Sequence, residues 1–159
     1  MDPVEALRAG EVVILPTDTV YGLCALPEHA ARLAELKRRP ADMPIATLYL
    51  EPPEALPAKV LPLLPGPYTF VVGGRGIRVP ALAPQVTDVL RVVGPVAATS
   101  ANLHGRRDPR RLADVAKELR DTAAAEVDAG ELPGIASTVI DLDAEPPIVL
   151  RQGAGLWPV

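Results

Sequence analysis

Blocks of hydrophobic and polar residues along the chain predict both strands and helices. Continuous apolar runs are typical of buried strands, and apolar positions at helical spacing predict amphipathic helices. Strands are expected at 11–15, 45–50, 68–72, 91–99, 138–142 and 148–150. Helices are expected at 3–9, 28–38, 81–90 and 109–121, the first and last of them beginning at Asp-Pro pairs. This order predicts an α/β (α+β) fold around a mixed sheet.

The segments between these elements read as loops and turns. Residues 16–23 are expected to form a loop, and the proline-rich segment 51–67 to hold short helical turns at most. The run from Gly73 to Gly76 favours a hairpin turn over a phosphate-binding loop. With 159 residues, no repeat and no linker, one domain over 1–159 is expected, without an additional C-terminal domain.

Composition limits the function classes. Apolar residues make up 48% and charged residues 23%, which is enough for a packed core. No apolar run is long enough to span a bilayer and the N-terminus lacks a secretory h-region, so a cytoplasmic protein without membrane contact is expected. The net charge of −4 means that a nucleic acid would need a local basic patch.

Several residue types are scarce, and several common motifs are absent. The chain has 3 lysines, 1 asparagine and 2 serines, and its many prolines and few amides are thermophile-like. There is no Walker A loop, G-x-G-x-x-G or G-x-S-x-G motif. Cys24 is expected in the core, His29 on the surface, and neither histidine has metal-ligand spacing, so no metal held by the protein is expected.

Polar residues gather in four clusters beside predicted strand ends, where α/β folds commonly bind ligands. Each cluster has a structural explanation, a capped turn or a helix end, and a functional one, because hydroxyls, amides and cations bind phosphate or ribose. The clusters are 16–23, 37–40, 99–102, and 137–141 together with 149–153. A fifth segment, 104–111, is either a solvated helix entry or a contact with an RNA backbone. Its arginines are Arg106, Arg107, Arg110 and Arg111.

Taken in order, the clusters resemble the YrdC/Sua5 family of threonylcarbamoyl-adenylate synthases over nearly the whole chain. The signature P-T-D/E-T-V-Y-G-L is complete at 16–23, and K-x-R…S-x-N falls on Lys37, Arg39, Ser100 and Asn102. P-G-P-x-T stands at 65–69 and R-x-P at 78–80. S-T-V-I/V-D stands at 137–141 and L-R-x-G at 150–153.

The resemblance implies a twisted mixed sheet with a concave, positively charged cavity. It also implies a nucleotidyltransferase reaction, in which L-threonine, bicarbonate and ATP give threonylcarbamoyl-AMP and pyrophosphate. Mg²⁺ would be held mainly by the phosphates. A separate transferase would use the product to modify adenosine 37 of tRNA. Binding of double-stranded RNA or tRNA by the family is a further implication.

The resemblance also assigns site residues. Lys37 and Arg39 would neutralise phosphate charge as the catalytic pair and bind ATP. Ser100, Asn102 and Arg151 would bind ATP with them. Threonine would be bound by Thr17, Thr19, Tyr21, Arg78, Ala98 and Ser137, with Arg78 facing its carboxylate and Tyr21 closing the pocket.

Some positions depart from the family pattern. Met43 and Leu48 replace an asparagine and a histidine, Gly74 replaces a threonine, and Leu64 replaces a tryptophan. Two functions therefore stay open on the sequence alone: an active synthase, or a paralogue without synthase activity that binds double-stranded RNA, tRNA or nucleotide. The oligomeric state is not predicted.

Overall fold

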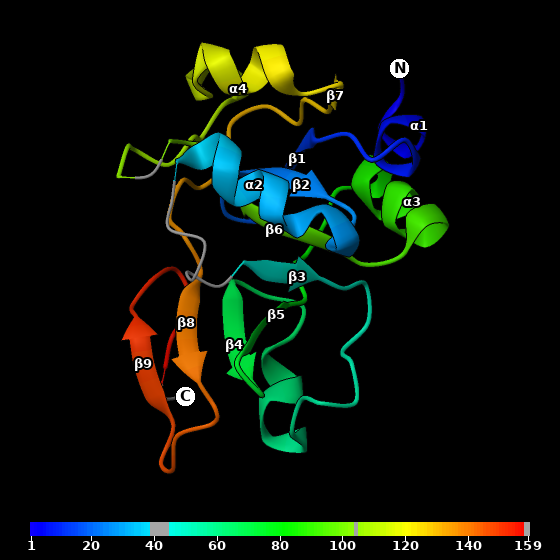
Figure 1. The fold of residues 1–159 in the computed structure, drawn as a ribbon. Helices are drawn as coiled ribbons and strands as arrows, with labels where there is room; N and C mark the ends of the chain where they lie inside the picture. The colour runs from blue at the N-terminus through cyan, green and yellow to red at the C-terminus, as the bar shows by residue number, and fades with distance from the viewer. Residues whose placement is uncertain (39–44, 104, 158–159) are drawn as a thin grey trace.

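The computed structural model describes residues 1–38, 45–103 and 105–157. The predictions for Arg39, Met43 and His104 lie outside these residues. Within the described chain, the strands form one mixed sheet in the order β7-β1-β2-β6-β3-β5-β4-β8-β9 (Figure 1). The strands are β1 (Val13–Pro16), β2 (Tyr21–Ala25), β3 (Ala46–Leu48), β4 (Tyr68–Val72), β5 (Arg75–Arg78), β6 (Val96–Ser100), β7 (Ala125–Glu126), β8 (Thr138–Asp141) and β9 (Ile148–Arg151). The predicted mixed α/β fold is confirmed.

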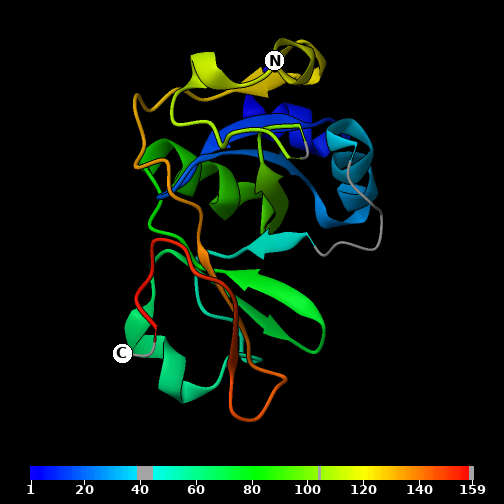
Figure 2. The ribbon, with the colours of Figure 1, turned by 90° about the vertical axis from the view of Figure 1, so that its left-hand side faces the viewer.

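Helices cover both faces of the sheet at β1, β2 and β6. They are α1 (Pro3–Arg8), α2 (Ala30–Lys37), α3 (Pro84–Val93) and α4 (Lys117–Thr122). The short 3-10 turn Pro27–His29 comes directly before α2, and a second one, Leu112–Asp114, comes before α4. Val13 and Leu15 pack with α1 and α3, whereas Ile14 packs with α2 and the segment before α4. Alternate residues of a strand point to opposite faces, so the continuous apolar run of β1 is buried on both sides (Figure 2). We call this part the helix-covered half.

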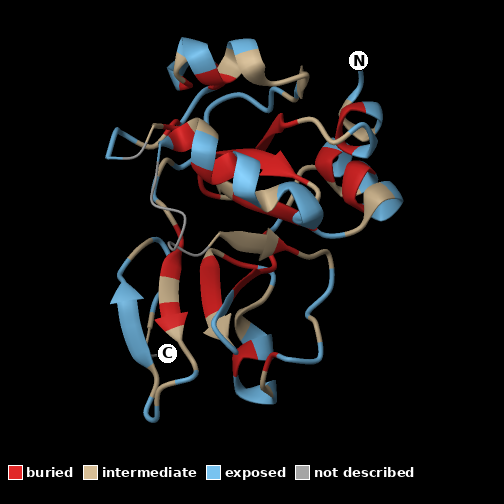
Figure 3. Cartoon of the chain, in the orientation of Figure 1, coloured by how far each residue is buried: buried red, intermediate tan, exposed pale blue. Residues whose placement is uncertain are grey.

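Strands β5, β4, β8 and β9 form the open half, while β7 pairs with β1 at the other edge of the sheet. A 3-10 helix, η2 (Ala58–Leu63), lies beside it and packs Val60 against a cluster around Phe70 and Ile140. Beyond β8, the edge strand β9 is exposed along its length (Figure 3). Strand β3 joins the two halves, since it pairs with β6 on one side and with β5 on the other.

Two strands occur where loops or turns were expected. The predicted loop 16–23 is wrong in its second part, because β2 begins at Tyr21 and pairs antiparallel with β1. The expected hairpin turn is confirmed at Gly73 and Gly74, which have φ values of 59° and 74°. This left-handed backbone suits glycine, and it returns the chain into β5, which the sequence pattern did not predict.

The predicted helix 109–121 is also wrong, since it is interrupted. The carbonyl oxygen of Pro109 accepts a 3.2 Å bond from Tyr21 N, so the segment's first residue is tied to β2. Val115 and Ala116 are extended, with ψ values of 133° and 136°, and α4 begins only after them. Tertiary contacts here outweigh the helical spacing of the apolar residues.

Helix α3 begins and ends three residues later than expected. Ala81–Ala83 lie outside it, and Pro84 occupies its first turn, where proline is favourable. Its C-terminal end takes Arg91–Val93 from the predicted strand 91–99, so that β6 starts at Val96. None of the helices in the described ranges is long and apolar enough to cross a membrane.

Candidate functional site

A cavity of about 460 Å³ lies where the two halves of the sheet meet. Its lining residues come from the β1–β2 loop, β2, the end of α2, β3, β6 and the loop after β6, and from β4, β5, β8 with the residues before it, and β9 of the open half. The polar lining residues are Thr17, Thr19, Lys37, Thr69, Arg78, Thr99, Ser100, Asn102, Arg106, Asp108, Ser137 and Arg151. Among the described lining residues, four are lysine or arginine and one, Asp108, is acidic.

Lys37 reaches the cavity from the last turn of α2. The helix stops there because Arg38 adopts a left-handed backbone with φ of 59°. Lys37 is only 5% exposed, and its Nζ donates to Thr99 Oγ1 at 2.9 Å and to Ser100 Oγ at 3.1 Å. These hydroxyls hold the ammonium group at the end of β6 and anchor the side chain in a fixed direction.

Asn102 organises the loop that follows β6. Its Oδ1 accepts from Ser100 Oγ at 2.6 Å, and its Nδ2 donates to Arg106 O at 2.6 Å and Asp108 Oδ1 at 3.1 Å. Three short bonds from one amide close the loop into a fixed shape. The side chain is 7% exposed, so these contacts also satisfy its buried polar atoms.

Arg78, at the end of β5, forms the opposite wall. Its Nη2 lies 2.7 Å from Asp18 Oδ1 and 3.2 Å from Thr19 Oγ1, and its Nη1 donates to Gly66 O at 2.9 Å. The side chains of Arg78 and Asp18 are only 6% and 15% exposed. The carboxylate therefore balances the guanidinium charge and holds it in position.

Ser137 and Arg151 connect β8 and β9 to the cavity. Ser137 Oγ shares a 2.7 Å bond with Thr69 Oγ1. Arg151 Nε donates to Ser137 O at 3.0 Å, and its Nη2 to Ser137 Oγ at 3.1 Å. Arg151 stands at the end of the exposed edge strand β9, and these two bonds hold its guanidinium beside Ser137, the residue before β8.

The structure brings together nearly all of the predicted ATP and threonine residues that it describes. Nine of them line the one cavity although they are far apart in sequence: Thr17, Thr19, Lys37, Arg78, Ala98, Ser100, Asn102, Ser137 and Arg151. Their grouping is a structural fact, whereas their ligands remain predictions.

Tyr21 is the exception, because it does not line the cavity. The ring is fully buried in the cluster beneath α2, on the face of β2 opposite Gly22. Its hydroxyl donates to Gly130 O at 2.7 Å, lies 3.2 Å from Asp128 Oδ1 and accepts from Ala129 N at 2.9 Å. Burial raises the pKa of this hydroxyl. The prediction that Tyr21 closes the threonine pocket is therefore corrected: it anchors the 128–130 segment.

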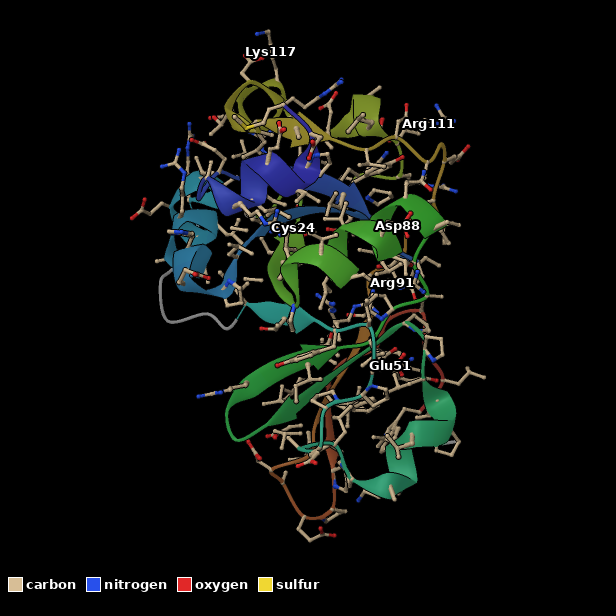
Figure 4. The ribbon with its side chains drawn as sticks, turned by 90° about the vertical axis from the view of Figure 1, so that its right-hand side faces the viewer. Cys24, Glu51, Asp88, Arg91, Arg111 and Lys117 are labelled. Carbon is tan, nitrogen blue, oxygen red and sulfur yellow. The ribbon has the colours of Figure 1, made fainter. Side chains whose placement is uncertain are left out.

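The four arginines of 104–111 have different environments. Arg106 lines the cavity, and Arg107 is exposed and outside the lining. Arg110 and Arg111 each form a 3.2 Å ion pair with Glu131, and Arg111 lies on the outer surface of the helix-covered half (Figure 4). The guanidinium groups of Arg110 and Arg111 therefore already have a carboxylate partner, whereas Arg106 lines the cavity.

Sequence reasoning missed four polar residues of the site: Asp18, Thr69, Thr99 and Asp108. Asp18 and Thr69 stand inside the quoted motifs, so motif position was the available signal. Thr99 lies in the polar cluster 99–102, but no motif assigns it a role. Asp108 precedes a proline and so has the pattern of a helix cap, and the fold places it against Asn102.

The departures from the family pattern also fall in different places. Leu48 lines the cavity, so this replacement touches the site. Gly74 lies in the β4–β5 turn, outside the lining, where its N–H and that of Gly73 donate to Asp143. These two bonds lower the pKa of Asp143.

Cys24 has no part in the site. It is fully buried on β2, in the cluster that contains residues of β1, α1 and α3, and Figure 4 shows it within the helix-covered half. Burial raises the pKa of its thiol to about 12, which keeps it protonated and unreactive. Its prediction as a core residue is confirmed, and His29 is exposed as expected.

The chain is similar to proteins of known family over almost its whole length. The Sua5/YciO/YrdC family model, described as "Telomere recombination", matches residues 5–153. The threonylcarbamoyl-AMP synthase of Pyrococcus abyssi is 35% identical over 92% of this chain and 52% of the relative. A putative threonylcarbamoyl-AMP synthase of Mycobacterium tuberculosis is 33% identical over 94% of this chain and 82% of the relative. The chain thus spans about half the length of the P. abyssi relative.

Solved structures agree with this match. The crystal structure of P. abyssi Sua5 complexed with L-threonine has a TM-score of 0.82 and 32% identity, over 94% of this chain and 52% of that one. Escherichia coli YciO has the same fold, with a TM-score of 0.82 and 24% identity over 98% of this chain and 89% of that one. The ordered motifs, the shared fold and the match over 5–153 show that this chain belongs to the Sua5/YciO/YrdC family.

Proposed function

We propose that this protein is an L-threonylcarbamoyladenylate synthase, which converts L-threonine, bicarbonate and ATP to threonylcarbamoyl-AMP and pyrophosphate. One observation carries the proposal: a single cavity gathers the residues that the family resemblance assigns to ATP and those that it assigns to threonine. The relatives named threonylcarbamoyl-AMP synthase support the same function.

The proposed reaction has two bond-forming steps. The threonine amine attacks the carbon of bicarbonate, an N–C bond forms, and water leaves to give the N-carboxylate. An oxygen of this carbamate then attacks the α-phosphorus of ATP, the bond from that phosphorus to the bridging oxygen breaks, and pyrophosphate leaves. Both steps need alignment and charge stabilisation rather than a covalent enzyme intermediate.

The residues of the cavity suit this division of work. Lys37, held by Thr99 and Ser100, would stabilise negative charge on the phosphates, together with Arg151. Arg39 keeps its proposed phosphate role from the resemblance alone. On the other wall, Arg78 would face the threonine carboxylate, and Asp18 fixes its orientation.

Threonine would be enclosed by small and hydroxyl-bearing residues. Thr19, which accepts a bond from Arg78, and Ser137 both line the cavity, and Ala98 adds a small apolar surface. Hydroxyls of this kind can bond the carboxylate, amine or side chain of an amino acid without adding charge.

Mg²⁺ is proposed to enter with the nucleotide. Among the described residues there is no group of three or more His, Cys, Asp or Glu side chains that could hold a metal ion. Asp108 is the acidic group among the described lining residues, and Asn102 already donates to it. The donor set thus suits an ion carried mainly by phosphate oxygens. Bound Mg²⁺ supplies charge neutralisation on the triphosphate.

The proposed product fits a downstream group transfer. A mixed anhydride of a carbamic acid and AMP is reactive, and a separate transferase would pass its threonylcarbamoyl group to adenosine 37 of tRNA. For RNA binding by this chain itself, no observation favours the 104–111 arginines, since Arg110 and Arg111 are paired with Glu131.

The test is pyrophosphate release by the purified protein, with ATP and Mg²⁺ and with L-threonine and bicarbonate added singly or together. Release is expected only when both are present, and a mass of threonylcarbamoyl-AMP should appear in step with pyrophosphate. Such turnover would also show that a histidine at the position of Leu48 is dispensable. Binding of ATP without any product would contradict the proposal and favour the non-synthesising paralogue.

A further inference from the structure

Arg106 stands in the wall of the cavity, although no motif of the family resemblance includes it. It lies in the loop after β6, four residues beyond Asn102. Its neighbour Arg107 has the same charge and is also exposed, but it does not line the cavity. A comparison of Arg106 with Arg107 therefore distinguishes the effect of a positive charge near the cavity from the effect of a side chain in the cavity wall.

The backbone at Arg106 is fixed by three features. Arg106 N donates to Leu103 O at 2.9 Å, and Arg106 O accepts from Asn102 Nδ2 at 2.6 Å. Gly105 has a φ of +83°, a left-handed backbone that favours glycine, and it also lines the cavity. Because Asn102 also bonds Ser100, the position of Arg106 is coupled to the end of β6 and so to Lys37.

The Arg106 guanidinium itself has no hydrogen bond or ion pair with any residue in the described ranges of the chain. The carboxylate of Asp108 lies in the same loop, but it accepts from Asn102 Nδ2 instead. Arg110 and Arg111, by contrast, are both paired with Glu131. A positioned backbone that carries an unpartnered cation at a cavity wall is the arrangement expected of a ligand-binding arginine.

We propose that Arg106 binds the polyphosphate of the nucleotide and thereby determines specificity for a nucleoside triphosphate over a monophosphate. This inference rests on the proposed function, because it deepens the assignment of the same site. Arg106 lines the same cavity as Lys37 and Ser100. These two residues, which bond to each other, are among those proposed to contact phosphate. A guanidinium suits this role because it can donate two parallel bonds to phosphate oxygens.

Calorimetry with ATP, ADP, AMP and inorganic pyrophosphate tests the inference, on the wild type, Arg106→Ala and the matched control Arg107→Ala. Loss of a charge-assisted hydrogen bond at a half-open site is expected to weaken ATP and pyrophosphate binding about tenfold. AMP binding is expected to change little, and Arg107→Ala is expected to bind all four probes like the wild type. The ATP effect should shrink as salt rises, since ionic strength screens it.

The outcomes separate this inference from the proposed function. ATP bound equally by the wild type and Arg106→Ala overturns the inference alone, as does an equal loss in both variants, which indicates a general charge effect. Arg106-dependent ATP binding without any threonylcarbamoyl-AMP formation supports the inference and contradicts the synthase, whereas pyrophosphate binding without ATP binding overturns the inference. A variant that loses only affinity for double-stranded RNA also overturns it, and a wild type that binds none of the probes overturns both.

Discussion

The helix-covered half and the open half of this molecule bury their strands to different extents. Strands β1 and β2 are buried at every residue, with helices on both faces, whereas all four residues of β9 are exposed. Yet both halves supply polar groups to the same cavity, Lys37 and Asn102 from one and Arg78 and Arg151 from the other. The site therefore depends on the meeting of the two halves, although their strands differ in burial.

The largest effect is expected from removal of the Lys37 cation. Lys37→Met keeps much of the buried stem but removes the ammonium group that Thr99 and Ser100 hold. Loss of one preorganised electrostatic group should lower pyrophosphate release at least about 100-fold. Circular dichroism should stay unchanged, and Lys59→Met, on the exposed surface of η2, is the matched control. Normal turnover by Lys37→Met would show that Lys37 has no catalytic role.

The Arg78–Asp18 pair tests the wall of the open half. Arg78→Ala leaves the carboxylate of Asp18 partly buried without its cation, and breaking such a pair costs up to about 3–5 kcal/mol of unfolding free energy. The KM for threonine should rise as well. The double variant Arg78→Ala/Asp18→Ala should regain stability in urea titration but keep the high KM. Recovery of both the stability and the KM for threonine in the double variant would mean that Arg78 only supports the fold. Arg75→Ala, at an exposed position of the same strand, is the surface control.

The contrast in burial is tested by two leucine truncations. Leu15→Ala, in the fully buried β1, should lower the unfolding free energy by about 2–5 kcal/mol, because a cavity forms between the helices and the sheet. Leu150 on β9 is 58% exposed, so Leu150→Ala should change the unfolding free energy by about 0.5 kcal/mol or less. Chemical denaturation measures both. Equal losses would contradict the difference in burial between Leu15 on β1 and Leu150 on β9.

Tyr21→Phe should give a smaller effect, confined to the segment that its hydroxyl anchors. Ala129 N loses its acceptor and Gly130 O loses its donor, so about 1–2 kcal/mol of stability should be lost. Hydrogen exchange should accelerate at Ala129, while the β1 amides remain protected. An altered KM for threonine with unchanged exchange would instead support the original assignment of Tyr21 to the pocket.

The smallest effect concerns Cys24 and has a defined pH dependence. Its folded pKa of about 12 lies above the unfolded value of about 8.5, so the protonated thiol contributes stability that is complete below about 8.5. That contribution should be lost as the pH rises through this interval, and Cys24→Ala should have a shallower decline. Native Cys24 should also resist iodoacetamide. In Leu150→Cys, the introduced thiol should react readily, and equal rates at both sites would contradict the burial of Cys24.

Several parts of the fold and site followed from the sequence because they rest on local signals. The apolar run of β1 and the glycine turn before β5 are local patterns, and both occur where expected. Long-range events explain the failures. Pro109 accepts from Tyr21 N and draws its segment out of a helix, and the pleat of β2 turns the Tyr21 side chain away from the cavity. The spacing of apolar residues along the chain does not reveal such long-range hydrogen-bond partners.

The mixed α/β class, the family resemblance and the set of polar groups available for chemistry could be predicted from the sequence, because motifs and hydrophobic patterns depend on residue order. The folded chain was needed to show that Lys37 and Arg78 line one cavity, that Glu131 pairs with Arg110 and Arg111, and that Arg106 stands at the cavity wall. Charge pairing and burial depend on distance in space, and strand pairing through β3 sets that distance for residues far apart in the chain.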